Sequence, residues 1–293
     1  MSRLWIACFV SSVMWVGSAG AQQGTVLEDQ QLTSDILGRV MHYAVYLPPG
    51  YTHNTRSYPV LYLLHGYTDR EWAWIQFGQV QHIADEAIRT GQVPPMIIIM
   101  PDAGISWYMN DRAAQQRYED YFFDELLPHV EATWPVRKSW EFRAISGLSM
   151  GGHGALLYVF KHPAMFSACA ALSAAVLTDE EVMQMSQEQW DQVWGFVVGE
   201  GLHGSARLTP HWKANNALHL AQQADKSLLQ RVAFYIDCGD DDFLYKGNAA
   251  LHVLLRDMGI AHEYRVRDGG HEWSYWRSAL PEVLRFVGRR FMR

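Results

Sequence analysis

Short, almost purely apolar runs alternate along the chain with longer segments in which apolar residues recur at helical spacing. A run that is apolar at nearly every position is typical of a strand covered on both faces, whereas helical spacing predicts an amphipathic helix. The expected strands cover 59–64, 96–100, 140–146, 166–175, 232–237 and 263–266, with two more within 28–47, and the expected helices cover 79–90, 118–134, 155–160, 248–258 and 280–290. This alternation predicts an α/β fold with a mostly parallel central sheet and, because crossover connections are right-handed, helices on both faces.

One long segment interrupts the alternation. Residues 178–226 are polar and helix-prone, and they contain Trp190, Trp194 and Trp212. We interpret them as a helical insertion that follows a strand of the sheet and covers part of a pocket; the alternative is a peripheral pair of helices without a catalytic role. The rest of the pattern predicts a single catalytic domain over residues 22–293.

The first 21 residues are organised like a secretory signal peptide. Arg3 supplies a short positive region, residues 4–16 are apolar apart from two serines, and Ala-Gly-Ala at 19–21 is a small-x-small cleavage site. The apolar run is short for a bilayer span, which favours cleavage before Gln22 over retention as a membrane anchor. We therefore expect a secreted or periplasmic protein without stable membrane insertion after cleavage.

Composition and charge limit the size of the core and argue against one class of partner. The chain has 293 residues, 49% of them hydrophobic, which supports one large core or at most two domains. The formal net charge is −7 and no block of like charges stands out, so nucleic acid is not an expected partner.

Cys169 and Cys238 lie in apolar runs, where free buried thiols are common. Because export makes a disulfide possible, a bridge between these two cysteines is the alternative.

The pentad Gly147-Leu148-Ser149-Met150-Gly151 is a G-x-S-x-G motif between an expected strand and an expected helix. On a strained turn of this kind a serine hydroxyl projects clear of the backbone, towards a base and a pair of amide donors. An ordinary glycine-rich turn is the alternative interpretation. The context favours Ser149 as a nucleophile.

A serine nucleophile needs a base, and the base needs an acid that fixes its tautomer. In α/β-hydrolases the acid follows the serine along the chain and the histidine comes last. The stretch Gly-Gly-His-Glu-Trp at 269–273 follows the expected strand 263–266, at the edge of the sheet where this architecture gathers its site. His271 is therefore the predicted base.

The predicted acid belongs to a run of three aspartates, Asp240, Asp241 and Asp242, that follows the expected strand 232–237. We favour Asp242 because the apolar residues at 243–244 would anchor the loop beneath it. The alternative interpretation of the three aspartates is a calcium-binding loop.

The oxyanion of an acyl-transfer reaction needs two backbone donors. One is expected from Met150, the residue after the nucleophile. The other should come from the loop that follows the strand 59–64, where Gly66 allows a sharp turn and the N–H of Tyr67 is our choice.

Together these segments resemble the esterase D-type putative esterase family, which includes S-formylglutathione hydrolases, tributyrin and acetyl esterases, feruloyl esterases and the antigen 85 mycolyltransferases. The resemblance extends from about residue 37 to residue 286. It is carried by Leu-Pro-Pro-Gly-Tyr at 47–51, Tyr-Pro-Val-Leu-Tyr-Leu-Leu-His-Gly at 58–66, the Gly-Leu-Ser-Met-Gly-Gly elbow, Cys-Gly-Asp-Asp-Asp-Phe-Leu-Tyr at 238–245 and Gly-His-Glu-Trp at 270–273. It implies the α/β-hydrolase fold, a triad of Ser149, Asp242 and His271, and no metal or organic cofactor.

Members of that family differ in substrate. Its formylglutathione hydrolases are cytosolic, which disagrees with the signal segment, and its mycolyltransferases use glutamate where this chain has Asp242. Its secreted members often remove acetyl or feruloyl groups from plant polysaccharides. Trp72, Trp107 and Trp273 are expected near the serine, where they could stack on a sugar or phenolic ring; the alternative is that they only pack the core or rim.

We therefore predict an exported serine carboxylic ester hydrolase that forms an acyl-enzyme and acts on short-chain acyl or feruloyl esters, with a small molecule or a carbohydrate as the alcohol. An acyltransferase that moves the acyl group to a sugar or lipid alcohol is the alternative within the same chemistry. A catalytically silent binding module with the same fold is the hypothesis from another class.

Overall fold

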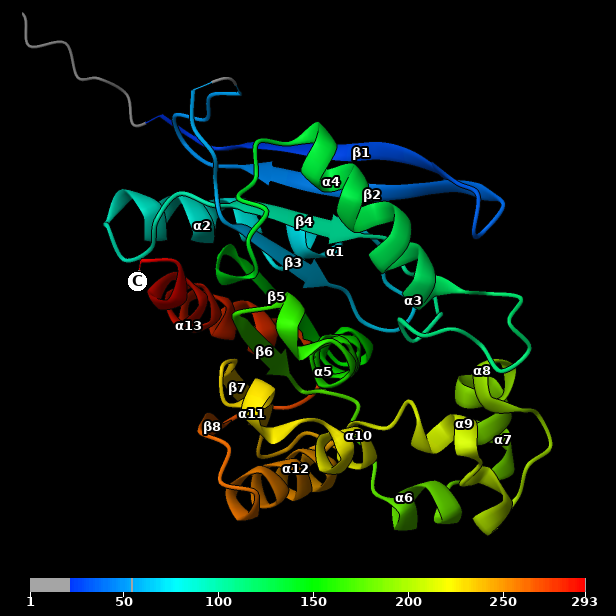
Figure 1. Ribbon diagram of the computed structural model, residues 1–293. Coiled ribbons are helices and arrows are strands. Elements are labelled where there is room, and N and C mark those ends of the chain that lie inside the picture. The colour runs from blue at the N-terminus through cyan, green and yellow to red at the C-terminus, as the bar shows by residue number, and fades with distance from the viewer. Residues whose placement is uncertain (1–21, 54, 293) are drawn as a thin grey trace, which may run out of the picture.

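An eight-stranded sheet in the order β1-β2-β4-β3-β5-β6-β7-β8 forms the centre of the computed structural model (Figure 1). The structure describes residues 22–53 and 55–292, so the predicted signal peptide lies outside the described residues. The strands are β1 (Thr25–Ser34), β2 (Arg39–Leu47), β3 (Val60–Leu64), β4 (Ile97–Pro101), β5 (Arg143–Leu148), β6 (Ala168–Leu172), β7 (Ala233–Gly239) and β8 (His262–Arg267). Strands β3 to β8 pair only in parallel with one another, whereas β2 is antiparallel to both β1 and β4, which confirms the predicted α/β fold.

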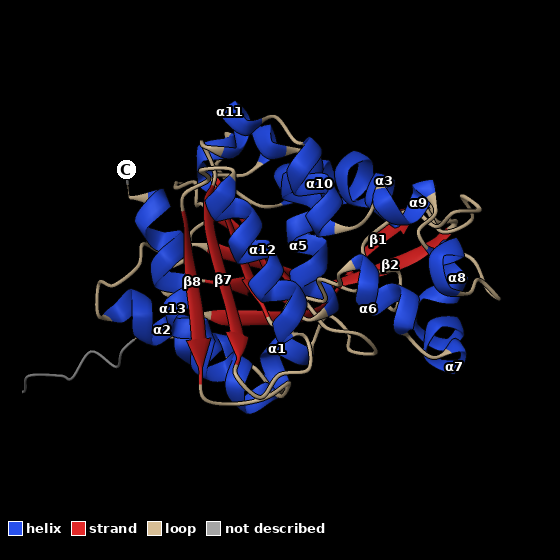
Figure 2. Cartoon of the chain, turned by 90° about the horizontal axis from the view of Figure 1, so that it is seen from below, coloured by secondary structure: helices blue, strands red, loops and turns tan. Residues whose placement is uncertain are grey.

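Helices lie on both faces of this sheet, as Figure 2 shows with the sheet between α2 and α13 on one side and α5 and α12 on the other. The longer helices are α2 (Val80–Arg89), α4 (Leu127–Thr133), α5 (Met150–Lys161), α10 (Ala217–Gln223), α12 (Tyr245–Asp257) and α13 (Trp273–Phe291). The shorter ones are α1 (Ala73–Gln76), α3 (Tyr118–Asp120), α6 (Asp179–Gln184), α7 (Gln187–Trp190), α8 (Phe196–Val198), α9 (Pro210–Lys213) and α11 (Lys226–Leu229), and a π-helical turn at Tyr121–Leu126 joins α3 to α4.

The apolar runs form strands because both faces of the sheet are covered. Every residue of β3 is buried, and successive side chains point to opposite faces. Tyr62 and Leu64 join the core that contains α5 and α12, while Leu61 and Leu63 join the core beneath α2 and α13. A strand of this kind has no polar face, which is why its sequence is apolar throughout.

Several element boundaries differ from the sequence-based prediction: α5 starts at Met150 rather than 155, and β6 covers only Ala168–Leu172 of the expected strand 166–175. Two further differences have a clear local cause. The expected strand 140–146 begins only at Arg143, because Trp140–Phe142 form a 3-10 turn. The expected helix 280–290 starts earlier, at Trp273, and continues through Pro281. A proline inside a helix removes one hydrogen bond and usually ends it, but here buried residues on both sides of Pro281 pack the helix against the sheet.

The predicted insertion contains helices α6 to α10, and a buried arginine joins α6 to α7. The guanidinium of Arg207 donates hydrogen bonds to the carbonyl oxygens of Val182 and Met185 and lies over the Trp190 ring, 5.0 Å from its centroid. Arg207 is only 2% exposed, so these contacts replace its hydration. Arg207 therefore fixes the first part of the insertion, residues 182–207, while α10 packs against α5 and α12.

Both cysteines in the described part of the chain, Cys169 and Cys238, are free and buried, as expected from their apolar strands. Burial raises the pKa of each thiol, which keeps both protonated. Over residues 22–53 and 55–292, no helix has the length and apolarity needed to cross a membrane.

Candidate active site

Ser149 lies on a sharp turn between β5 and α5 and has a φ of 53°. Few residues other than glycine adopt such a backbone conformation, and strain of this kind collects at functional sites. The turn is possible because the residues two positions before and two positions after Ser149 are glycines. A Cβ added at Gly147 would lie 2.4 Å from the carbonyl oxygen of Gly151, and one added at Gly151 would lie 2.6 Å from those of Leu64 and His65.

Hydrogen bonds to the adjacent strand and helix hold the Ser149 backbone in this conformation. Its N–H donates to the carbonyl oxygen of Leu172, 2.9 Å away. Its own carbonyl oxygen accepts from the N–H groups of His153 and Ala175, each at 3.0 Å. Both backbone polar groups of the strained residue are satisfied, so the main chain that carries the serine side chain is held in place.

Ser149, His271 and Asp242 lie together although each follows a different strand: β5, β8 and β7, respectively. The Ser149 hydroxyl lies 2.9 Å from Nε2 of His271, and Nδ1 of the same ring lies 2.9 Å from Oδ2 of Asp242. An ionised carboxylate can only accept, so Nδ1 carries the proton and Nε2 is free to accept the serine hydroxyl. This is the tautomer that a general base for Ser149 requires.

The Asp242 side chain is buried, and Oδ1 accepts a hydrogen bond of 2.9 Å from the N–H of Leu244. Burial by itself would raise the pKa of the Asp242 carboxyl. Hydrogen bonds from His271 and from the Leu244 N–H outweigh that effect and hold the pKa below its usual value. Asp242 therefore stays ionised and able to orient His271 at neutral pH.

Asp240 and Asp241 point elsewhere and are exposed. Oδ1 of Asp240 accepts the N–H of Gly269, which ties the aspartate loop to the loop that carries His271. Together with Asp268, these two aspartates form an exposed group whose carboxylate oxygens lie within 4.8 Å of one another. Asp242 is not part of that group, so the three consecutive aspartates do not form one calcium-binding loop.

The two segments that carry the expected amide donors lie next to Ser149. Met150 is the first residue of α5, a position whose N–H has no acceptor inside the helix. Across from it, a Cβ built on Gly66 would lie 3.7 Å from Cβ of Ser149, so the loop that contains Tyr67 runs directly beside the nucleophile. No hydrogen-bond acceptor for the Tyr67 N–H occurs among the residues that the structure describes.

The buried ring of His65 fixes this loop. Its Nε2 accepts the N–H of Ala103 at 2.8 Å, which leaves the proton on Nδ1, and Nδ1 donates to the carbonyl oxygen of Gly66, also at 2.8 Å. The Tyr108 hydroxyl donates to the carbonyl oxygen of His65. Both ring nitrogens are therefore occupied in holding the loop, and His65 is not available as a base for Ser149.

A mostly apolar cavity of about 700 Å³ opens at Ser149 and His271. That volume is typical of a site that encloses a small organic ligand. Its walls comprise Gly66, Tyr67, Asp69, Trp107, Leu148, Ser149, Ala175, Leu177, Met185, Gln189, Val193, Trp194, Phe243, Leu244, His271, Glu272, Trp273 and Trp276.

Two of the three tryptophans predicted to contact substrate, Trp107 and Trp273, line the cavity, but Trp72 does not. The Trp72 ring packs edge-on against Phe77, which in turn contacts Trp273. Phe77 does not line the cavity either, so the rings of Phe77 and Trp273 connect Trp72 to the cavity wall. Phe243 was expected only to anchor the aspartate loop, but its side chain is 68% exposed and lines the cavity. Its ring centroid lies 4.5 Å from that of His271.

The insertion supplies one wall of the cavity. The Trp107 indole stacks on Trp194 with ring centroids 3.6 Å apart, and its N–H donates to the carbonyl oxygen of Val193. His153 packs edge-on against both indoles, and burial lowers its pKa to about 3, so it is a neutral packing residue. The helical segment is thus not peripheral: it shapes the space next to Ser149.

Comparisons with known proteins show which family this chain resembles. A family model described as "Putative esterase" matches residues 34–287. An acetyl esterase of Caldicellulosiruptor saccharolyticus is 25% identical over 244 residues, which cover 80% of this chain and 85% of that protein. Esterase Rv1288 of Mycobacterium tuberculosis is 29% identical over 248 residues, which cover 78% of this chain but only 51% of the relative. A solved ferulic acid esterase is 34% identical, with a TM-score of 0.78 over 92% of this chain and 100% of its own.

Proposed function

Given that the chain belongs to the putative esterase family and is a carboxylic ester hydrolase, we propose that it acts through Ser149, His271 and Asp242. The observation that carries this proposal is the continuous hydrogen-bonded line from the Ser149 hydroxyl through His271 to Asp242, with 2.9 Å at each step. Ser149 and His271 line the cavity described above, so a bound ester could reach them.

In the proposed reaction, Oγ of Ser149 attacks the ester carbonyl carbon while Nε2 of His271 takes the hydroxyl proton. The carbonyl oxygen becomes an oxyanion, which the N–H groups of Tyr67 and Met150 stabilise. Collapse breaks the ester C–O bond, and His271 gives its proton to the departing alcohol. Water then repeats the sequence on the acyl-enzyme and releases the carboxylic acid, while Asp242 stabilises the imidazolium in both steps.

We further propose that the protein is exported and that the substrates are short-chain acyl or feruloyl esters of carbohydrates. Two relatives support the acyl groups, since one is named an acetyl esterase and another a ferulic acid esterase. The cavity supports a planar or short acyl group, because its aromatic rings could pack against one. Export rests on the signal-like pattern of residues 1–21.

A substrate panel tests this proposal: acetylated xylan, methyl ferulate, tributyrin and 4-nitrophenyl acetate, each with and without an added acceptor alcohol. We expect acetate or ferulate release to dominate, with water as the main acceptor. Predominant formation of a new ester in water would instead identify an acyltransferase. For export, the mass of the protein recovered outside the cytoplasm should correspond to a chain that begins at Gln22.

The backbone donor on the Tyr67 loop can be tested through Gly66. A Cβ at Gly66 would lie 2.7 Å from Cδ1 of the buried Leu148 side chain and 3.7 Å from Cβ of Ser149. Gly66→Ala therefore forces either the Leu148 side chain or the loop that carries the Tyr67 N–H to move, and we expect the loop to be displaced because Leu148 is packed in the core. We expect kcat to fall by about 10²-fold to 10³-fold, the effect of losing one oxyanion donor, with little change in KM. Tyr67→Phe is the control: it removes only the hydroxyl that donates to the Gln192 carbonyl, and it should keep activity within a few-fold of the wild type. Equal losses in the two variants would contradict the assignment of the main-chain donor.

A further inference from the structure

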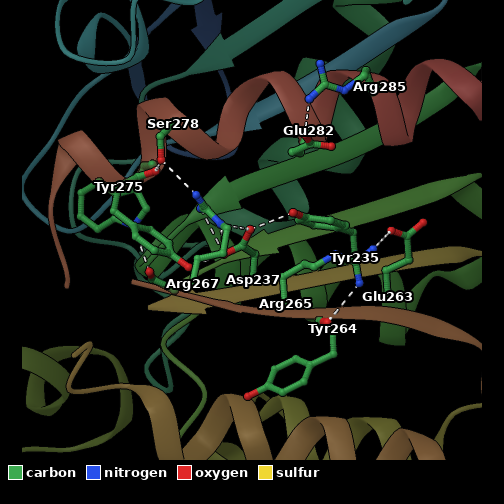
Figure 3. A network of polar contacts seen from close by, with 12 residues as sticks. Tyr235, Asp237, Glu263, Tyr264, Arg265, Arg267, Tyr275, Ser278, Glu282 and Arg285 are labelled. Atoms are coloured by element: carbon green, nitrogen blue, oxygen red, sulfur yellow. Dashed lines mark hydrogen bonds and ion pairs between the residues drawn. The ribbon is translucent and has the colours of Figure 1, made fainter. Parts of the chain in front are cut away.

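Asp237, near the end of β7, is the centre of a buried network of polar contacts (Figure 3). Its side chain is fully buried. The carboxylate accepts hydrogen bonds from the hydroxyl groups of Tyr235, at 2.8 Å, and Tyr275, and it pairs with the guanidinium of Arg267, whose Nε lies 3.0 Å from Oδ2. A buried charge is tolerated when it is paired and hydrogen-bonded in this way.

Two of these partners stand at the two ends of the loop that carries His271. Arg267 is the last residue of β8, and Tyr275 lies in the first turn of α13, so only residues 268–272 connect the strand to the helix. Arg267 also donates to Oγ of Ser278 at 3.0 Å, and its guanidinium lies over the Tyr275 ring, 4.2 Å from the centroid. One carboxylate therefore holds both ends of the loop.

The main chain of Asp237, separately from its carboxylate, is also connected to the His271 ring through a series of contacts. The carbonyl oxygen of Asp237 accepts the N–H of Ser173 at 2.7 Å, and Oγ of Ser173 accepts the indole N–H of Trp276 at 3.0 Å. The Trp276 ring meets the His271 ring nearly at right angles, with centroids 4.9 Å apart. The indole is thus held in place on one side and contacts the imidazole on the other.

We propose that Asp237 is a positioning residue for the hydrolysis reaction: through Arg267 and Tyr275 it fixes the loop of His271, and so keeps the imidazole in line with Ser149. This inference rests on the proposed roles of Ser149 and His271. Alignment matters because a displacement of a reacting group by about 1 Å can cost about 10²-fold in rate. Asp237 contacts neither substrate nor the reacting atoms and acts only through its partners.

The two tyrosines provide a matched pair of variants. Tyr275→Phe and Tyr235→Phe each remove one hydroxyl from the same carboxylate and keep a buried ring in place, but only Tyr275 belongs to the helix that follows His271. We expect similar losses of thermal stability in both. We expect only Tyr275→Phe to lower kcat, by about tenfold with KM unchanged, to slow fluorophosphonate labelling of Ser149, and to shift the acid limb of the kcat/KM pH profile, which reports the base in the free enzyme.

A second measurement does not depend on ester hydrolysis. The Nδ1 proton of His271, bonded to Asp242, can be followed by NMR in the full chain, and we expect its signal to weaken or shift in Tyr275→Phe and to stay unchanged in Tyr235→Phe. Equal effects of the two variants on rate and on this signal, or a Tyr275→Phe protein identical to the wild type, would overturn the positioning role. A wild-type protein that neither hydrolyses esters nor reacts with fluorophosphonate would instead refute the proposed function, and the NMR comparison would still decide whether Asp237 positions His271.

Discussion

Replacing Ser149 by alanine is expected to lower kcat for 4-nitrophenyl acetate by about 10⁶-fold, the scale found when the nucleophile of a triad is removed. The alanine side chain cannot form the acyl-enzyme, while the strained turn and its backbone hydrogen bonds remain. Rates of purified Ser149→Ala and wild-type protein, together with loss of fluorophosphonate labelling, measure the effect.

The control for that experiment is Ser167→Ala. Ser167 is also buried, but its hydroxyl donates to the carbonyl oxygen of Arg143, away from the cavity. We expect it to keep nearly full activity with at most a modest loss of stability. A Ser149→Ala protein that is folded and retains more than a trace of activity would refute the proposed mechanism.

Asp242→Asn should reduce kcat by about 10⁴-fold, the second-largest effect we expect. An asparagine amide can donate to Nδ1 of His271, which would place the ring proton on Nε2 and deprive Ser149 of its base. The side chain is nearly the same size, so the loop and its bond to the Leu244 N–H can persist. The measurement is kcat against pH, with circular dichroism to show that the fold is intact.

Asp241→Asn is the matched control, because it makes the same chemical change one residue away on an exposed side chain. We expect its kcat to stay within about a factor of two of the wild type, since surface substitutions usually have small effects. A larger loss in Asp241→Asn than in Asp242→Asn would mean that the wrong aspartate has been assigned to His271.

The sequence could predict the sheet, and could bring together the three side chains that we propose to react, because both depend on short-range patterns. Continuous apolar runs identify strands covered on both faces, and the small residues around Ser149 follow from the 2.4 Å and 2.6 Å approaches that any Cβ would make there. The choice among the three aspartates also followed a local signal. Leu244 is buried, as that choice required, but Phe243 is 68% exposed and lines the cavity, so only one of the two apolar residues anchors the loop.

What the sequence could not predict depends on contacts between distant segments. Pro281 suggested a helix end, but packing of the buried residues around it outweighs the lost hydrogen bond. Trp72 and Trp273 looked alike in the sequence, but Trp273 lines the cavity while Trp72 contacts Phe77, a ring that itself packs against Trp273. The role of Asp237 has no sequence signal at all, since its partners lie up to 38 residues away.

The insertion has a consequence for how this enzyme can diversify. Its residues at 185–194 form a wall of the cavity, whereas Ser149, Asp242 and His271 come from connections of the sheet outside that segment. Substitutions, length changes or exchange of the helical segment can therefore alter which acyl group fits without moving the reacting atoms. Selection for a new ester, in nature or in the laboratory, can act on one stretch of chain while the chemistry is inherited unchanged.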